Sequence, residues 1–267
     1  MKIDVFDLEG KAIKEIELPK VFGENIREDL IIRAFLATMS KKRQPYGTDV
    51  MAGKRTSAHY HGLRRYRWTM MGRNMARLPR VHGKVSPHLM WRARFVPQTR
   101  GGRAAHPPKV EKVWIQKINK KERKKAIRSA IAATANRELV LGRGHRVKEI
   151  KELPIVVEDK IQELKKTKEV VEYFKKIGLG KELERIKKRK IKSGKGKGRA
   201  RKYKRKIGPL IVINENKGIG KAVNNIAGTN VCKVQNLSVE TLAPGAMSGR
   251  LTIYSLSSVE KLRSLYK

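Results

Sequence analysis

The sequence predicts an α/β fold, in which helices cover both faces of a mostly parallel sheet. Two basic extensions interrupt this fold. Short apolar runs, LPIVV at 153–157 and PLIVI at 209–213, are typical of strands buried on both faces of a parallel sheet. They alternate with segments of helical spacing, which is the pattern of a single three-layer α/β domain. We expect residues 1–40 and 110–267 to form this domain, with 41–109 as a long basic loop and 187–208 as a second basic extension.

The N-terminal part predicts a hairpin followed by a helix. Residues 3–6 and 13–18 alternate apolar with charged side chains around a turn at 8–11, which predicts a β-hairpin. From Ile26 to Thr38 the apolar residues recur at helical spacing. Glu28 and Asp29 lie in the first turn, where negative charge is favourable, and the helix must end before Pro45.

The middle of the chain predicts one long helix, a buried strand and several short helices. Val113 to Ile118 suggest a short strand or an extended lead-in, and Asn119 with Glu122 is a capping pair for a helix through Arg137 or beyond. Small residues on its inner face would let it pack closely on a sheet. LPIVV is the buried strand, and short helices are expected at 160–166, 167–177 and 181–190.

The C-terminal part continues the alternation of strands and helices. PLIVI is a strand, 218–227 is helical after a glycine turn, and 231–234 and 251–254 are two more strands. Residues 258–266 form a closing helix with Ser257 as its N-cap. We expect Phe35 and Trp114 in the core and Cys232 as a small apolar residue of a strand.

Composition restricts the class of protein. A net charge of +40 and a pI near 10.7 predict a nucleic-acid or anionic-surface partner. The hydrophobic content of 39% still allows a real core. The only cysteine, Cys232, excludes an internal disulfide framework and a cysteine zinc cluster, and fits a reducing compartment. The N-terminus lacks the features of a secretory signal, and no run approaches the 18 apolar residues of a membrane span.

Residues 41–109 contain a single acid, Asp49, and many lysines, arginines and glycines. Aromatic side chains stand among them: Tyr46, Tyr60, Tyr66, Trp68, Trp91 and Phe95. Arginine and lysine contact phosphates, and aromatic rings stack on unpaired bases. The alternative is a disordered cationic loop, but disordered segments are poor in aromatics. With no apolar periodicity, we expect this segment to have no core and to be ordered by RNA.

Two glycine-rich stretches invite a nucleotide-binding interpretation. GKGKGRA at 194–200 follows a charged helix and precedes a strand, so a flexible RNA-binding hairpin is favoured. Gly218-Ile219-Gly220-Lys221 does follow a strand and open a helix, as a mononucleotide site would. However, Val223 holds the place of the fingerprint's third glycine, and no Ser or Thr follows Lys221. A tight βα turn is the favoured interpretation.

The residues predict no catalytic, metal or cofactor site. His59-x-His61 could chelate a metal, yet no carboxylate or thiol close in sequence completes a ligand set, so base stacking or phosphate contact is favoured. A triad of Ser57, His59 and Asp49 would need a rigid pocket that this segment is not expected to build.

Several blocks in order resemble the universal large-subunit ribosomal protein four family, in its archaeal and eukaryotic form. The resemblance covers nearly the whole chain. It is carried by GRNMARLPRV at 72–81, GGRAAHPPK at 101–109, RSAIAATA at 128–135, GRGHR at 142–146, GKGKGR at 194–199, GPL at 208–210, LAPG at 242–245 and GR at 249–250. Residues 64–71 and 86–91 depart from the family pattern.

The resemblance implies a Rossmann-like domain that binds no nucleotide and a long loop that threads through ribosomal RNA. The loop tip, near 72–80, would help to line the peptide exit tunnel. The implied tip residues are Gly72, Arg73, Asn74, Met75, Ala76 and Arg77. The implied RNA-binding residues are Lys54, Arg55, His59, Arg64, Arg73, Arg77, Arg80, Arg92, Arg94, Arg100, Arg103, His106, Arg143, His145, Arg146, Lys195, Lys197, Arg199 and Arg201.

We therefore expect a structural constituent of the large ribosomal subunit, cytoplasmic and not an enzyme, which binds large-subunit ribosomal RNA and supports its assembly. Neighbouring ribosomal proteins and the nascent peptide would be its other partners, and no membrane or cofactor is expected. The alternative is an RNA-modifying or nucleotide-dependent α/β enzyme that uses Gly218–Lys221. A chromatin or membrane-surface protein is a weaker alternative, because the aromatic, glycine-rich loop favours structured RNA.

Overall fold

The computed structural model describes residues 1–266 except 148 and 151. The chain divides into two compact units. The first, called the globular unit, comprises Met1–Lys42 and Ile115–Lys267, and the second, called the basic segment, comprises Arg43–Trp114.

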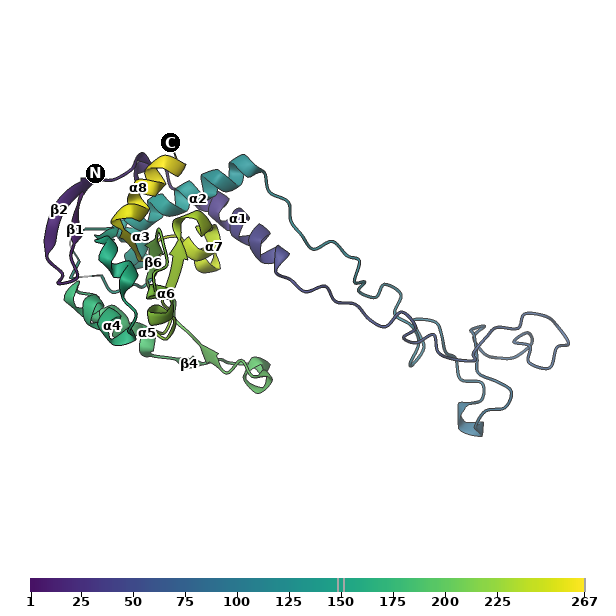
Figure 1. Cartoon of the computed structure of the whole chain (residues 1–267). Coiled ribbons are helices and arrows are strands. Elements are labelled where there is room, and N and C mark those ends of the chain that lie inside the picture. Colours follow the sequence, from purple (N-terminus) through teal and green to yellow (C-terminus); the bar gives the residue numbers. More distant parts are fainter. Residues whose placement is uncertain (148, 151, 267) are drawn as a thin grey trace. The chain divides into compact units, whose positions relative to one another are not determined.

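The globular unit is built on a six-stranded sheet of mostly parallel strands (Figure 1). The strand order is β2 (Ala12–Glu17), β1 (Lys2–Phe6), β3 (Ile155–Val157), β8 (Thr252–Ser255), β6 (Leu210–Ile213) and β7 (Asn230–Lys233). Only β2 runs antiparallel, as the second strand of the N-terminal hairpin, and the other neighbours pair in parallel. The α/β class, the hairpin and the buried runs as strands are thereby confirmed.

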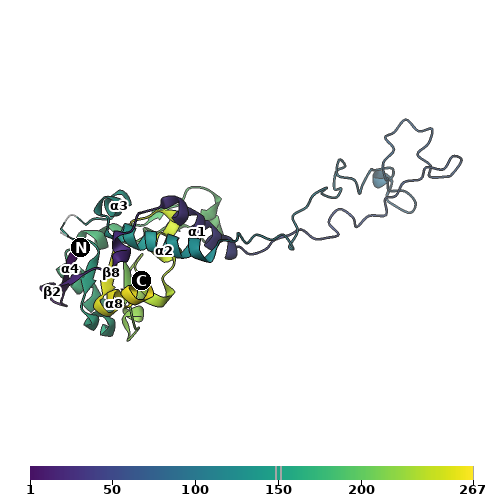
Figure 2. The ribbon, with the colours of Figure 1, turned by 90° about the horizontal axis from the view of Figure 1, so that it is seen from above.

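Apolar side chains cover both faces of this sheet. On β6, Leu210 and Val212 join one apolar cluster, whereas Ile211 and Ile213 join a second. Neighbouring residues of a strand point to opposite faces, so each cluster occupies one face. The first is completed by α1 (Glu28–Lys41), α2 (Lys120–Ala135), α7 (Val239–Leu242) and α8 (Leu256–Leu265). The second is completed by α3 (Arg137–Gly142), α4 (Thr167–Lys176), α5 (Gly180–Lys187) and α6 (Ile219–Asn224). Figure 2 labels α3 and α4 of this group.

Helix α2 packs closely, as its small residues predict, but its two ends differ from the prediction. Ala126 and Ala130 are buried in the first cluster. Asn119 holds the N-cap position without a side-chain capping bond, and Glu122 pairs instead with Arg33 of α1 at 2.7 Å, so the capping pair is wrong. The helix ends at Ala135, because Asn136 leaves the helical conformation and its side chain caps α3.

The cap of α8 and the helix expected at 160–166 are corrected, and other local predictions are confirmed. Ser255, not Ser257, caps α8 by accepting from the Ser258 amide, while the Ser257 hydroxyl donates to Asp159 at 2.6 Å. The helix expected at 160–166 is a short 3-10 turn, Asp159–Glu163. Of the two alternatives for residues 113–118, the structure has the extended lead-in. Phe35 and Cys232 pack against the first cluster, and burial raises the pKa of the Cys232 thiol.

The stretch at 187–208 forms a small antiparallel ribbon. Strand β4 (Lys190–Ile191) pairs with β5 (Tyr203–Lys204) across a 3-10 turn at Lys195–Arg199. In Figure 1 this ribbon lies apart from the main sheet. Gly194, at φ +86°, gives the chain the left-handed bend at which the turn begins. Over the residues that the structure describes, no helix is both long and apolar enough to cross a membrane.

Candidate nucleic-acid interface

The charge of the basic segment is almost entirely uncompensated. Its acids are Asp49 and Glu111, and over 43–114, all of which the structure describes, the one carboxylate ion pair is between Asp49 and Arg55. Arg64, Arg77 and many other cationic side chains are exposed. Like charges held this close repel each other, so the segment favours a polyanionic partner.

Guanidinium groups lie over aromatic rings along the segment. The Arg43 guanidinium is 3.8 Å from the Trp114 ring centroid, and that of Arg73 is 4.2 Å from the Trp91 centroid. Such pairs are attractive because the positive charge meets the negative face of the ring. They also put flat aromatic surface beside positive charge, which is the combination that binds unpaired bases and their phosphates.

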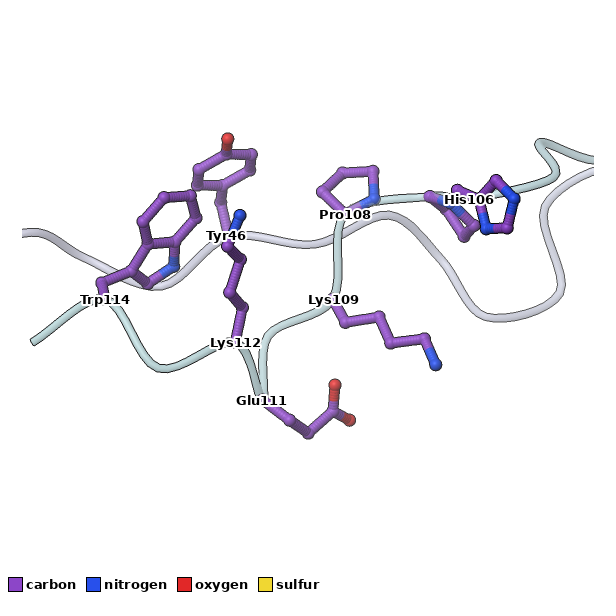
Figure 3. Close-up of a pocket in the computed structure, with 8 residues that line it drawn as sticks. Tyr46, His106, Pro108, Lys109, Glu111, Lys112 and Trp114 are labelled. Carbon is purple, nitrogen blue, oxygen red and sulfur yellow. The ribbon is translucent and has the colours of Figure 1, made fainter.

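One such place is a hollow of about 700 Å³ (Figure 3). Tyr46 and Trp114 stack at its edge, with ring centroids 5.5 Å apart. The remaining lining residues are His106, Pro107, Pro108, Lys109, Glu111 and Lys112. The prediction that Trp114 belongs to the core is wrong, because it lies half-buried in the basic segment and its indole N–H is buried without a hydrogen-bond partner among the described residues.

Most predicted RNA-binding side chains of this segment are accessible. Exposed are Lys54, Arg55, His59, Arg64, Arg73, Arg77, Arg92, Arg100 and His106, and half-buried are Arg80, Arg94 and Arg103. Arg80 donates to the carbonyls of Trp91 at 2.7 Å and Ala76 at 3.0 Å, and Arg94 donates to Arg100 O at 2.8 Å. These two arginines therefore also hold the segment's own backbone. The predicted tip residues Gly72–Arg77 are exposed.

The basic segment buries side chains of its own, contrary to the expectation that it has no core. Met70 is 2% exposed and Val81 8%. In the same segment, the rings of His61, Tyr66, Trp68, His82 and Trp91 pack against one another. Apolar periodicity reports only on helices and strands, and this cluster forms from irregular backbone, so the pattern could not reveal it. Burial and the neighbouring His59 and His82 lower the pKa of His61.

In the globular unit, Arg143 and His145 hold the protein's own chain. Arg143 donates to the carbonyls of Met247 and Pro244, and burial lowers its pKa to about 10. His145 is 3% exposed, and its Nδ1 lies 2.7 Å from a carboxylate oxygen of Glu182. Burial lowers the pKa of His145, although the hydrogen bond to Glu182 opposes that shift. These two predicted RNA-binding side chains thus have structural contacts within the protein itself, whereas Arg146 is exposed.

Glu182 is the centre of this buried network. Its side chain is fully buried and accepts from the Arg185 guanidinium at 2.6 and 2.8 Å and from the Arg146 amide at 3.0 Å. Burial by itself would raise the pKa of this carboxyl, but the bonds from Arg185, His145 and Arg146 outweigh burial and lower it to about 2.

The second basic extension presents its charge openly. Lys195, Lys197, Arg199 and Arg201 are exposed around the turn of the β4–β5 ribbon. Arg189 stacks on Tyr203, with the guanidinium carbon 4.7 Å from the ring centroid. The pattern of aromatic faces beside cations therefore recurs here.

Comparison with known proteins places this architecture in a family. The model of the family described as "Ribosomal protein L4/L1 family" matches residues 16–265. The chain belongs to the ribosomal protein L4/L1 family. It is 49% identical over 267 residues to "Large ribosomal subunit protein uL4" of Methanosphaera stadtmanae, covering all of this chain and 98% of that protein. The protein of the same name from Nanoarchaeum equitans is 48% identical, with 98% of each chain covered. The one from Methanocaldococcus jannaschii is 47% identical, with each chain covered completely.

In this L4/L1 family member, the Gly218–Lys221 stretch is the tight βα turn that the sequence favours. It joins β6 to the six-residue helix α6. The Asn216 side-chain oxygen accepts from the amides of Gly218 at 3.3 Å and Gly220 at 3.1 Å. The protein's own side chain thus occupies the amides that a phosphate would need.

Sequence reasoning missed two features of this family member's basic segment. The sequence does not reveal the hollow beside Tyr46 and Trp114, because these residues are 68 positions apart and the apolar pattern places Trp114 in the core. His82 is missed as a neighbour of His61, although their Nε2 atoms lie 2.8 Å apart. The sequence offers only weak signals for these features. Trp114 follows the basic stretch at 106–112, and His82 lies in a segment that contains several other histidines.

Proposed function

We propose that this protein is a structural, non-enzymatic constituent of the large ribosomal subunit in the cytoplasm, where it binds large-subunit ribosomal RNA and contacts neighbouring ribosomal proteins. The observation that carries the proposal is a family match along residues 16–265 in a chain whose 43–114 segment exposes almost uncompensated positive charge. Neutralisation of phosphates by these cations releases bound counterions, which supplies the main driving force for association.

The basic segment would contact RNA in two ways. Exposed side chains such as Arg64, Arg77 and Arg92 would meet phosphates. The hollow beside Tyr46 and Trp114 would take an unstacked base, with Lys109 and Lys112 near its phosphate. A base or phosphate oxygen would also give the Trp114 indole N–H the acceptor that the protein does not provide.

We further propose that the globular unit is a Rossmann-like three-layer anchor that binds no nucleotide, and that Gly72–Arg77 lies beside the nascent peptide in the exit tunnel. Support for the anchor is the parallel sheet with an apolar cluster on each face. Support for the tip is the exposure of all six residues and their place inside the family match over residues 16–265.

Co-sedimentation tests the assignment to the large subunit. Epitope-tagged full-length protein expressed in a related archaeon should pellet with large subunits and remain there after a high-salt wash that removes loosely bound basic proteins. Recovery of the protein only in light fractions, or its complete release by the wash along with added free basic protein, would contradict the assignment.

A photo-crosslinker tests the tip. Placed at Met75, which is 37% exposed, it should crosslink to a stalled nascent chain. The matched control is the same crosslinker at Met247, which is 58% exposed in the globular unit. Equal labelling at both positions, or labelling at Met247 alone, would show that the tip does not face the peptide.

A further inference from the structure

Three histidines of the basic segment converge although they come from two stretches of chain. His59 and His61 lie on one stretch, and His82 lies 21 residues after His61. The potential ligand atoms of the three rings all lie within 4.8 Å of one another. The other histidines of this segment, His88 and His106, are not members of the group.

Backbone carbonyls orient two of these rings. Nδ1 of His59 lies 2.9 Å from Ser57 O, and Nδ1 of His82 lies 2.9 Å from Arg80 O. A ring nitrogen beside a carbonyl carries the proton, so Nε2 of each ring keeps its lone pair. Histidines that bind metals are typically held in this way, with the non-binding nitrogen donating to a carbonyl or carboxylate.

Aromatic side chains pack against two of the three rings, those of His61 and His82, whereas His59 is exposed. Tyr66 packs on His61 with centroids 4.8 Å apart, and Trp68 packs on His82 at 5.2 Å. Trp91 stacks with His82 at 6.3 Å, and the neighbouring Met70 is 2% exposed. These contacts restrict the rotation of the His61 and His82 rings, which lowers the entropic cost of gathering them around an ion.

We propose that His59, His61 and His82 form a transition-metal site, with Zn²⁺ as the ion. Imidazole nitrogen suits Zn²⁺, Cu²⁺ and Ni²⁺, whereas Mg²⁺ and Ca²⁺ require oxygen ligands that this group lacks. Around tetrahedral Zn²⁺, with Zn–N near 2.05 Å, neighbouring nitrogens lie about 3.3 Å apart. The Nε2 atoms of His61 and His82 are hydrogen-bonded at 2.8 Å, with the proton on His61 because His82 carries its own on Nδ1. To bind Zn²⁺ through both atoms, His61 would take the tautomer that is protonated at Nδ1, and the 2.8 Å separation would widen by about 0.5 Å.

The site has a structural role in this proposal. Three protein ligands leave the fourth position to water or to an oxygen from outside the chain. The ion links the 59–61 stretch to His82 and thereby closes the intervening part of the basic segment. Because the ligands are neutral and the segment is cationic, the affinity should be lower than that of cysteine-rich zinc sites.

The test uses full-length protein without an affinity tag, purified free of metal, with Zn²⁺ alone as the probe. Competition against a chromophoric chelator of known affinity should reveal one site per chain. His82→Ala and His59→Ala should each weaken Zn²⁺ binding at least tenfold. His88→Ala and His106→Ala, which remove histidines of the same segment outside the group, should leave it unchanged. Co²⁺ bound in place of Zn²⁺ should show the strong visible absorption of tetrahedral coordination.

Limited proteolysis gives a second readout that does not depend on affinity. Zn²⁺ should slow cleavage within residues 43–114 of the wild-type protein at least threefold, but not of His82→Gln, a variant that keeps a polar side chain of similar reach. Unchanged far-ultraviolet circular dichroism should show that each variant's globular unit is folded. Equal Zn²⁺ affinity of wild type and His82→Ala, an equal loss in His88→Ala, or an octahedral Co²⁺ spectrum would each overturn the proposal.

Discussion

At the scale of single residues, the most informative side chains are cations that face inward. Arg250 is 2% exposed and donates to Thr241 O at 2.7 Å, Gly208 O at 3.0 Å and the Asn230 side chain at 2.6 Å. Burial lowers its pKa to about 10, so it stays charged at neutral pH. The formal charge of +40 therefore overstates the charge available to RNA, because Arg250 and Arg143 bind the protein's own carbonyls.

Glu182→Gln should destabilise the globular unit by about 3 kcal/mol at neutral pH, because a pKa lowered from 4.5 to about 2 measures how strongly the fold prefers the carboxylate. The stabilisation is fully present above pH 4.5 and is lost as pH falls from 4.5 to about 2. His145, whose pKa is also lowered, contributes in the same direction as pH falls below 6.5. Urea unfolding across this pH range measures the difference between variant and wild type, which should shrink in acid.

Glu184→Gln is the matched control for that substitution, since Glu184 lies on the same helix but is exposed. It should change stability by less than about 0.5 kcal/mol. Equal effects of the two substitutions would show that the buried network around Glu182 is not what stabilises this helix.

Arg250→Lys should cost about 2 kcal/mol of unfolding free energy, although it keeps the charge. A lysine ammonium cannot match the planar fork that reaches acceptors in several segments, so buried carbonyls would lose their donors. Thermal unfolding measures the change, with Arg263→Lys as control, because Arg263 makes an exposed bond to Glu17 O. A stability equal to that of the control would mean that the fork geometry of Arg250 is unimportant.

At the scale of elements, the sequence predicts strands better than it predicts the ends of helices. LPIVV and PLIVI are recognisable because burial on both faces leaves a continuous apolar run. Helix ends depend on side-chain geometry that spacing does not contain, so Asn136 ends α2 and Ser255 caps α8, against expectation. The sequence predicts which kinds of residue the candidate interface contains. It does not predict which side chains meet, such as His61 and His82, because those contacts form only in the folded chain.

Removal of the basic segment should leave the globular unit folded. The Gln116 amide donates to Ser40 Oγ at 3.0 Å, so the two ends that would be joined are already neighbours. A chain lacking 43–114, joined by a short Gly-Ser linker, should keep the wild-type circular dichroism and melt cooperatively. Loss of cooperative melting, while the same linker inserted into the intact chain has no effect, would show that the globular unit depends on the segment.

At the scale of the whole molecule, binding to RNA should be dominated by electrostatics. Each phosphate contact lowers log K by about 0.7–0.9 for each unit rise in log salt concentration. Exchange of Lys195, Lys197, Arg199 and Arg201 for Gln should therefore reduce the slope for a large-subunit RNA fragment by about 3 if all four contact phosphates. A salt titration by filter binding measures this slope.

The control exchanges four exposed lysines of the globular unit, Lys14, Lys165, Lys168 and Lys175, for Gln. This control removes the same amount of positive charge. If the slope depended only on net charge, it would therefore fall equally in both variants. An identical fall in slope would show that the β4–β5 ribbon has no particular place in the RNA interface.

The bond between Ser40 and Gln116 has a consequence for how such a protein can change over evolutionary time. Since the globular unit fixes both ends of the insertion, lengthening it adds only a slow, logarithmic entropic cost, about 0.6 kcal/mol per doubling. Insertions, deletions and substitutions within 43–114 can therefore accumulate with little penalty to the folding of the globular unit. Selection on 43–114 then acts on the contacts that this stretch makes with its partners. Folding of the globular unit and recognition by the basic segment can therefore evolve separately.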